Sequence, residues 1–168
     1  MRSGGWGSLA LLLLAAVVLL RPWESLDELG RDEPPAAATA YVSRVVDGDT
    51  VEVDLGGTEE DVRYIGVDTP ETVKPDTPVQ CFGPQASAFN HRLVEGRRVR
   101  LVFGEEQRDV YGRLLAYVYL DGRFVNAELI RRGLARTLTI PPNDRFATRL
   151  KRLEIAAART GRGLWGAC

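Results

Sequence analysis

Residues 50–67, TVEVDLGGTEEDVRYIGV, decide the fold, because they describe two strands and the turn that joins them. The first six residues alternate between polar and apolar side chains, which is typical of a strand with one buried face. Gly56-Gly57 marks a turn, and residues 62–67 have the composition of the returning strand. The stretch therefore predicts an antiparallel hairpin that packs one face on a core.

Strand-like alternation extends on both sides of this hairpin. It begins at Tyr41, recurs at residues 98–103 and returns at Leu114–Leu120. Asp121-Gly122 then predicts a hairpin turn into residues 123–125. The first three of these segments and the two strands of the hairpin make five short strands in all.

Three helices are expected between and after the strands. Apolar spacing and capping residues place them at Phe82–Leu93 with Gly96 after its end, at Ala127–Arg132 with Asn126 as its cap, and from Phe146 to Ala157 with Asn143 or Asp144 as its cap. Five strands with interspersed helices and no βαβ rhythm predict an α+β protein. A small closed barrel, the five-stranded OB-fold with three helices, is the candidate architecture, preceded by an N-terminal hydrophobic helix and a linker.

The chain begins with a different kind of sequence. Arg2 precedes an uncharged apolar run, residues 8–20, which has the length of a signal-peptide core and is short for a spanning helix. Trp6 and Trp23 bracket the run as interfacial anchors would. We expect residues 1–23 to be a signal peptide or an uncleaved signal anchor, residues 24–40 an acidic Pro/Ala-rich linker, and residues 41–168 the domain. Either alternative predicts an exported domain, secreted or anchored facing outside, and the membrane becomes a partner if the segment is uncleaved.

Export changes the interpretation of the two cysteines, Cys81 and Cys168. An oxidising compartment favours one disulfide between them, and two free thiols are the alternative. Two cysteines and the single His91 do not provide a zinc site at recognisable spacing.

Charge is unevenly distributed, although the net charge is only -1. Residues 41–76 hold ten acidic and three basic side chains, whereas residues 90–163 hold sixteen basic and eight acidic ones. Acidic and basic regions that fold together can hold a cation beside a polyanion such as a phosphodiester. A solvated, charge-rich surface is the alternative interpretation.

Functional residue types are densest in two segments. The first is Asp47-Gly48-Asp49-Thr50, and the second is Arg63 followed by Val67-Asp68-Thr69-Pro70-Glu71. Hard cations such as Ca²⁺ take oxygen ligands, and two carboxylates with a backbone carbonyl make a partial shell that leaves room for water and substrate. Asp-Gly alone is more often a simple turn.

These residues belong to a set of five motifs that resembles the staphylococcal nuclease family over residues 41–165. The motifs are Val46-Asp47-Gly48-Asp49-Thr50-Val51, Arg63 to Thr72, Phe82-Gly83-Pro84-Gln85-Ala86, Asp109-Val110-Tyr111-Gly112-Arg113 and Gly163-Leu164-Trp165. Their order and approximate spacing match the family.

The resemblance implies a role for each site residue. Asp49 and Asp68, with the Thr69 carbonyl, would hold Ca²⁺, and Glu71 would be the general base or the positioner of the attacking water. Arg63 and Arg113 would grip the scissile phosphate, because a planar, permanently charged fork suits its oxygens, and Tyr111 would lie near a terminal phosphate of the nucleotide. Surface or turn roles for the two arginines, and ring packing for Tyr111, are the alternatives.

One stretch departs from the family. Where the founding member has two tyrosines that pack on the nucleotide base, residues 138–142 are Leu-Thr-Ile-Pro-Pro. Aromatic–base stacking contributes roughly 1–3 kcal/mol per base. We therefore predict weak binding of mononucleotides and little base preference.

The resemblance as a whole implies a hydrolase: a Ca²⁺-dependent endonuclease that cleaves the P–O5′ bonds of DNA and RNA and leaves 3′-phosphate ends. The sequence is silent on oligomeric state, and a monomer is the default expectation. Two alternatives remain open, a non-catalytic module that binds nucleic acid or protein, and a calcium-stabilised surface domain. The retention of Asp49, Asp68, Glu71, Arg63 and Arg113 argues against the first, and the second has no use for both arginines.

Overall fold

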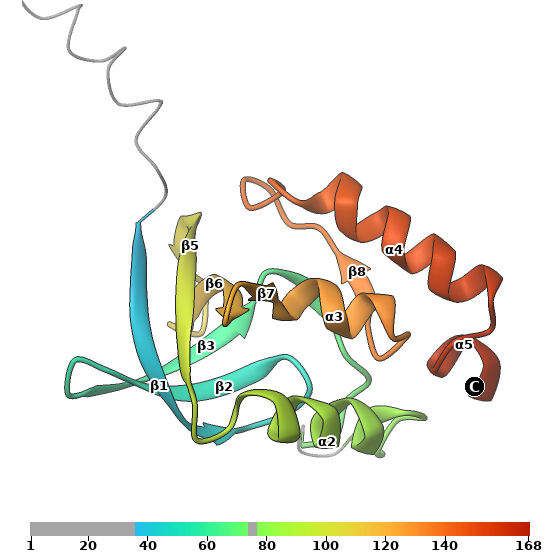
Figure 1. The fold of residues 1–168 in the computed structure, drawn as a ribbon, viewed down its shortest axis with the longest axis horizontal. Coiled ribbons are helices and arrows are strands. Elements are labelled where there is room, and N and C mark those ends of the chain that lie inside the picture. The colour runs from blue at the N-terminus through green and yellow to red at the C-terminus, as the bar shows by residue number, and fades with distance from the viewer. Residues whose placement is uncertain (1–35, 74–76) are drawn as a thin grey trace, which may run out of the picture. The chain divides into compact units, whose positions relative to one another are not determined.

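The computed structural model describes residues 36–73 and 77–168, and these form one compact unit (Figure 1). The strands are β1 Ala37–Val45, β2 Thr50–Leu55, β3 Thr58–Tyr64, β4 Gly66–Asp68, β5 Arg98–Arg108, β6 Leu114–Leu120, β7 Arg123–Phe124 and β8 Arg136–Leu138. The helices are α2 Gly83–Val94, α3 Val125–Arg131, α4 Ala147–Arg159 and α5 Leu164–Ala167.

Five strands close into a barrel, which confirms the predicted OB-fold class. Antiparallel pairing joins them in the order β3-β2-β1-β5-β6, and a parallel pairing of β3 with β6 completes the ring. Strand β1 pairs with β5 through its first half and with β2 through its second half. A register shift between Val42 and Arg44 interrupts the pairing with β2. Such an irregularity bends a strand.

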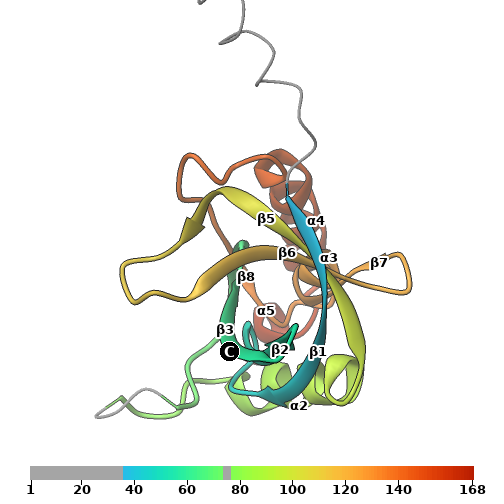
Figure 2. The ribbon, with the colours of Figure 1, turned by 90° about the vertical axis from the view of Figure 1, so that its left-hand side faces the viewer.

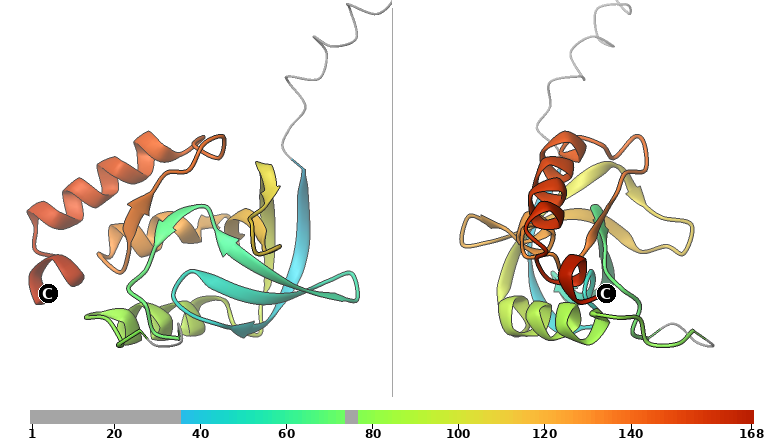
Figure 3. Two further views of the ribbon diagram at one scale, coloured as in Figure 1. Left: turned by 180° about the vertical axis from the view of Figure 1, so that it is seen from behind. Right: turned by 90° about the vertical axis from the view of Figure 1, so that its right-hand side faces the viewer.

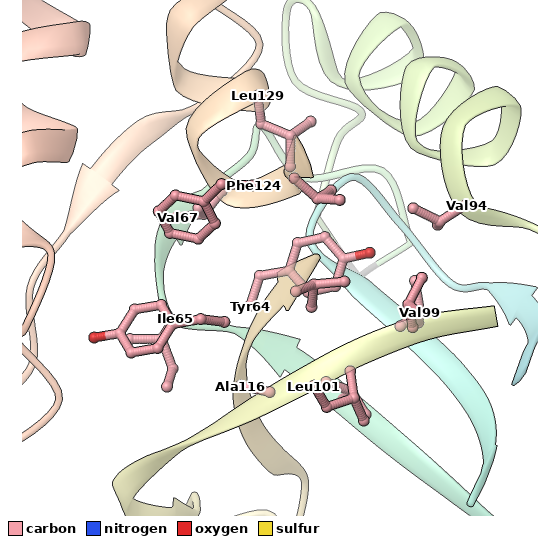
Figure 4. Close-up of a cluster of buried hydrophobic side chains, with 14 of the residues drawn as sticks. Tyr64, Ile65, Val67, Val94, Val99, Leu101, Ala116, Phe124 and Leu129 are labelled. Carbon is pink, nitrogen blue, oxygen red and sulfur yellow. The ribbon is translucent and has the colours of Figure 1, made fainter. Parts of the chain in front are cut away.

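The barrel interior is filled by the apolar faces of its strands. Figure 4 shows Tyr64, Val99, Leu101 and Ala116 from three different strands converging on one cluster, with Leu129 of α3 packed beside them. All five are buried, and the central valines of β2 are fully buried too. Burying such side chains contributes roughly 1.5–3 kcal/mol each, so the alternating pattern that predicted the strands also stabilises the barrel.

Three helices of seven or more residues pack around this barrel, in agreement with the predicted number, and α5 adds one turn at the C-terminus. Helix α2 lies across one end of the barrel, and α4 lies beyond α3 on the far side from β1 (Figures 1 and 3). Two elements were not expected from the sequence. They are β8, which pairs with β4 in a separate two-stranded sheet, and α5.

The predicted strand 62–67 is corrected to two strands. Gly66 has φ 78°, in the left-handed region that glycine tolerates, and the chain turns there between β3 and β4. Leu150 of α4 also packs so closely that a Cβ on Gly66 would lie 2.6 Å from its side chain. The first strand likewise differs in extent, because β1 begins at Ala37 and not at Tyr41.

Both predicted cap assignments are wrong. Asn126 lies inside α3, fully buried, where it accepts a hydrogen bond from the Val118 N–H and donates one to the Ile65 carbonyl, each at 2.9 Å. Helix α4 begins after Phe146 without a side-chain cap, and Asn143 instead bonds both backbone groups of Glu106. Long-range partners compete successfully with local capping because buried backbone groups must be satisfied.

Glu154 fastens α4 to β8. Its carboxylate accepts hydrogen bonds from the Thr137 N–H and hydroxyl, both at 2.9 Å, and pairs with Lys151. Burial acts to raise the pKa of Glu154, but the Lys151 and Thr137 contacts outweigh it and lower that pKa.

None of the helices in residues 36–73 and 77–168 is long and apolar enough to cross a bilayer. The expected signal or anchor, residues 1–23, lies outside the described residues, as does most of the expected linker.

Candidate active site

The site begins at the turn between β1 and β2. The Asp47 carboxylate accepts a hydrogen bond from the Asp49 N–H at 2.9 Å, which stiffens the turn. Only glycine fits at position 48, because a Cβ there would lie 2.7 Å from the Thr69 side chain. This close approach brings the segment after β4 against the turn.

Asp49 is the buried centre of the site, with 4% of its surface exposed. One carboxylate oxygen accepts hydrogen bonds from the Thr69 N–H at 2.6 Å and hydroxyl at 2.9 Å. The other pairs with Arg63 at 3.0 Å. Burial raises the pKa of Asp49 to about 7, and the neighbouring Asp47 charge adds to the effect, whereas Arg63 and Thr69 act in the opposite direction.

Arg63 joins the two predicted metal carboxylates. One of its terminal nitrogens pairs with Asp49, and the other pairs with Asp68 at 3.2 Å. The first nitrogen also donates a hydrogen bond to the Val67 carbonyl at 2.7 Å. The turn at Gly66 makes this possible, because it folds β4 back past the end of β3, where Arg63 lies.

The donor set fits a calcium ion. Asp49 retains a raised pKa in spite of its partners, so the described groups leave its buried negative charge incompletely compensated. Asp68 supplies a second carboxylate, which is half exposed. Carboxylates, a carbonyl and water are the oxygen ligands that Ca²⁺ prefers. No group of three or more His, Cys, Asp or Glu side chains suited to a metal occurs among the described residues, so the carbonyl and water would have to complete the shell.

Glu71 lies on the loop after β4. Its carboxylate accepts hydrogen bonds from the N–H groups of Thr72 and Val73, both at 2.8 Å. Gln80 forms two hydrogen bonds with the Glu71 backbone. Its side-chain oxygen accepts one from the Glu71 N–H at 3.0 Å, and its backbone N–H donates one to the Glu71 carbonyl at 2.9 Å. Sequence reasoning missed Gln80, since only the fold brings the two ends of this loop together.

The residue after Gln80 carries the expected disulfide. Cys81 and Cys168 are bonded, with their Cα atoms 6.0 Å apart and 87 positions of sequence between them. The bond ties α5 to the loop that carries Glu71. Beside it lies a cavity of about 200 Å³ whose lining includes Asp68, Gln80 and Arg136.

Arg113 reaches the site from the connection between β5 and β6. Its side chain donates to the Asp109 carboxylate at 2.7 Å, and its guanidinium lies 5.4 Å from the centroid of the exposed Tyr111 ring. Partial burial acts to raise the pKa of Asp109, but hydrogen bonds from Arg113 and Tyr111 outweigh it and lower that pKa. Asp109 therefore positions Arg113, a role that its place in the motif did not reveal.

The two arginines meet at one cavity of about 300 Å³. Arg63, Arg113 and Tyr111 all contribute to its lining, together with Leu138 and Ile140 from the stretch that lacks aromatics. The lining therefore combines two arginines with aliphatic side chains, and Glu106 and Asp109 add two acidic residues. Arg63 belongs both to this cavity and to the carboxylate cluster, so it links the candidate metal ligands to the candidate phosphate site.

A closed five-stranded barrel with three helices defines the class, an OB-fold domain. It carries two carboxylates paired with Arg63, and Arg63 and Arg113 line one cavity. The family model described as "Staphylococcal nuclease homologue" matches residues 61–167. The chain therefore belongs to the staphylococcal nuclease family, and the family predicted from the motifs is confirmed.

Curated relatives agree with this assignment. A thermonuclease of Staphylococcus intermedius is 41% identical over 157 residues, covering 92% of this chain and 94% of its own length. A thermonuclease of Staphylococcus hyicus is 37% identical, covering 92% of this chain and 95% of its own. Endonuclease YncB of Bacillus subtilis is 41% identical over 74% of this chain and 60% of its own length.

Proposed function

We propose that the protein is an exported, Ca²⁺-dependent endonuclease that hydrolyses phosphodiester bonds of DNA and RNA. The relatives named thermonuclease and endonuclease support the nuclease class. The observation that carries the proposal is the convergence of Arg63 and Arg113 on one cavity, with Arg63 also bonded to Asp49 and Asp68.

Each site residue has a proposed part in the reaction. Arg63 and Arg113 bind the scissile phosphate and stabilise the charge that develops on its oxygens during attack. Glu71 orients the attacking water or accepts its proton as the water oxygen bonds to phosphorus. The P–O5′ bond then breaks, which leaves a 3′-phosphate on one product and a 5′-hydroxyl on the other.

Asp49, Asp68 and the Thr69 carbonyl would hold the calcium ion. When bound, the ion supplies Lewis-acid polarisation of the phosphate and offsets negative charge at the site. Thr69 also fixes the Asp49 carboxylate through its N–H and hydroxyl, so this ligand is oriented before the ion binds.

Cleavage assays test the activity and the residue assignments together. The full chain is incubated with plasmid DNA and with RNA, in Ca²⁺ and in EDTA, beside Glu71→Gln and Arg113→Ala. Each substitution should lower the rate by at least about 10²-fold. Arg44→Ala is the matched control, since it removes an exposed arginine on β1 that pairs with Glu52.

The outcomes separate the hypotheses. Absence of Ca²⁺-dependent cleavage by the parent chain would remove the enzyme proposal, and binding without cleavage would favour the non-catalytic module. If Glu71→Gln and Arg113→Ala cleave as fast as Arg44→Ala does, the catalytic roles assigned to Glu71 and Arg113 are wrong.

Base preference follows from two aliphatic residues of the cavity lining. Leu138 and Ile140 would contact a base without the stacking that aromatic rings at their positions would provide, so we propose weak mononucleotide binding and little base discrimination. Calorimetric titration with the four nucleotides would contradict this if one of them bound tightly and the others did not.

Export and oligomeric state are proposals of the same kind. Residues 1–23 would direct the domain outside, and the domain would act as a monomer. Blotting membrane and medium fractions, with sequencing of the mature N-terminus, separates an anchor from a cleaved signal. Size-exclusion chromatography with light scattering tests the monomer.

A further inference from the structure

Three aromatic rings pack in a row that leads away from the cavity of Arg113, and each ring has an arginine over it. The Arg100 guanidinium lies 5.7 Å from the Tyr119 ring centroid. Tyr119 stacks on Phe124 with centroids 4.9 Å apart and planes 14° apart. Arg149 lies over the Phe124 ring at 5.3 Å. These contacts connect β5, β6, β7 and α4.

The row continues toward the start of α4. Phe146 packs on Phe124 at 5.1 Å, and Arg145 lies over the Phe146 ring at 5.4 Å. We call these six residues the arginine–aromatic strip: Arg100, Arg145, Arg149, Tyr119, Phe124 and Phe146. A guanidinium held over a ring can still donate N–H groups to an anion, and less side-chain freedom is lost when it binds one.

The strip is strongly basic. Its three arginines are exposed, and none of them forms an ion pair with a carboxylate of the described residues. Arg98 joins Arg100 in lining a cavity of about 390 Å³ at one end of the strip. The acidic neighbours are Asp121, which lines the same cavity, and Asp144, next in sequence to Arg145. Positive charge therefore exceeds negative charge along the strip.

The other end of the strip adjoins the candidate active site. Tyr117 packs edge-on against Phe146 at 4.8 Å, and its hydroxyl donates a hydrogen bond to the Asn143 carbonyl. Asn143 lines the cavity that contains Arg63 and Arg113. The β5–β6 connection and the β6–β7 turn project from opposite sides of the barrel (Figure 2), so the strip runs from the side of the active site toward the opposite side.

We propose that the arginine–aromatic strip is a second binding surface, which holds the sugar–phosphate backbone of a polynucleotide some distance from the bond that is cleaved. This inference rests on the proposed function for the identity of the polyanion. Arg113 precedes β6 and Tyr119 lies near its end, a span of roughly 20 Å at 3.3 Å per residue. At about 3.4 Å per nucleotide of one strand, a substrate needs about six nucleotides to reach from one to the other.

The strip predicts that long and short substrates behave differently. A 20-nucleotide single strand should contact the three arginines, whereas a trinucleotide at the active site should not reach Arg100, which lies at the end of the strip remote from that site. Replacing each arginine should remove about one phosphate contact, and each lost contact lowers the slope of log affinity against log salt by about 0.7 for a single strand. Three substitutions should therefore lower that slope by about two.

The experiment measures binding by fluorescence anisotropy, with the full chain carrying Glu71→Gln so that cleavage does not interfere. Labelled 20-mer and trinucleotide are titrated at several salt concentrations against Arg100→Gln/Arg145→Gln/Arg149→Gln. The matched control is Arg92→Gln/Arg97→Gln/Arg159→Gln, which removes the same charge at exposed arginines outside the strip.

The strip variant should bind the 20-mer at least about 10-fold more weakly at low salt, with the reduced slope. With the trinucleotide its slope should fall by no more than about 0.7, the share of Arg145. Equal losses in the strip and control variants would overturn the proposal, since net charge alone would then explain binding, and so would an unchanged slope. If the triple variant does not fold, as judged by circular dichroism, Arg100→Gln alone tests the same slope with the 20-mer, with an expected decrease of about 0.7. Absence of cleavage by the parent chain would remove the proposed function but would leave these binding results to decide the strip.

Discussion

Removal of the disulfide should destabilise the domain by several kilocalories per mole. The perturbation is Cys81→Ser/Cys168→Ser, which opens a loop closed across 87 positions of sequence. In the chain-entropy model a loop of this length restricts the unfolded chain by about 15 cal/mol/K, or about 4.6 kcal/mol at 25 °C. The loss of native disulfides typically costs about 2–5 kcal/mol, so the worked value lies at the upper end of that range.

The assay is urea denaturation followed by far-UV circular dichroism, with thermal unfolding as a second measurement. For a domain of this size a loss of 4.6 kcal/mol corresponds to a decrease in Tm of roughly 15–20 °C. The slope of free energy against urea should also increase, because the unfolded chain becomes more expanded without the crosslink.

Reductant provides the matched control. It should lower the free energy of unfolding of the parent to nearly that of the double variant, and it should not change the free energy of unfolding of the double variant. A loss below about 1 kcal/mol in both the variant and the reduced parent would refute the reasoning. Stability would then come from the packing of α5, whose Leu164 is buried and whose backbone N–H bonds the Gly133 carbonyl.

Three further predictions concern single contacts. The folded-state pKa of Glu154 is lowered, so its contribution to the free energy of unfolding is present above the unfolded pKa of about 4.3 and is lost as the pH falls through the folded pKa. Glu154→Gln should therefore lower the free energy of unfolding at pH 7 and change it little at pH 3. A difference between the urea curves of parent and variant that does not depend on pH would contradict this. Asn126→Ala leaves a buried backbone N–H and a buried carbonyl without partners and should cost roughly 2–5 kcal/mol in the same assay, whereas a loss under 1 kcal/mol would show that water replaces the amide. Gln80→Ala removes the acceptor for the Glu71 N–H and should lower kcat about 10-fold with little change in KM. Gln80→Glu keeps an acceptor and should retain most of the parent kcat. Equal losses of kcat in both variants would contradict the positioning role of Gln80.

Much of the fold could be predicted because the signals are local. The alternation in residues 50–55 and 114–120 matches β2 and β6, and the apolar spacing at Phe82–Leu93 matches α2 closely. These patterns reflect which face of each element is buried. The misplaced caps of α3 and α4 show the limit of local reasoning, since Asn126 and Asn143 had capping positions by sequence but bond distant backbone groups.

The candidate site, like the fold, could be predicted from the sequence only in part. The motifs identified Asp49, Asp68, Arg63, Glu71 and Arg113 by residue type, order and spacing. They did not reveal the partners that hold these residues in place. Gln80, Asp109 and the Thr69 hydroxyl were recognised only from contacts, because none of them differs from an ordinary loop residue in the sequence.

Alternation and motif order are properties of neighbouring residues, and they were enough to predict the barrel class, the family and the residues of the candidate site. The tertiary structure alone decided that Arg63 joins both carboxylates, that burial raises the pKa of Asp49, and that three arginines lie on aromatic rings in one strip. These features depend on desolvation and on contacts between segments far apart in the chain. Only the closing of the barrel and the turn at Gly66 bring those segments together.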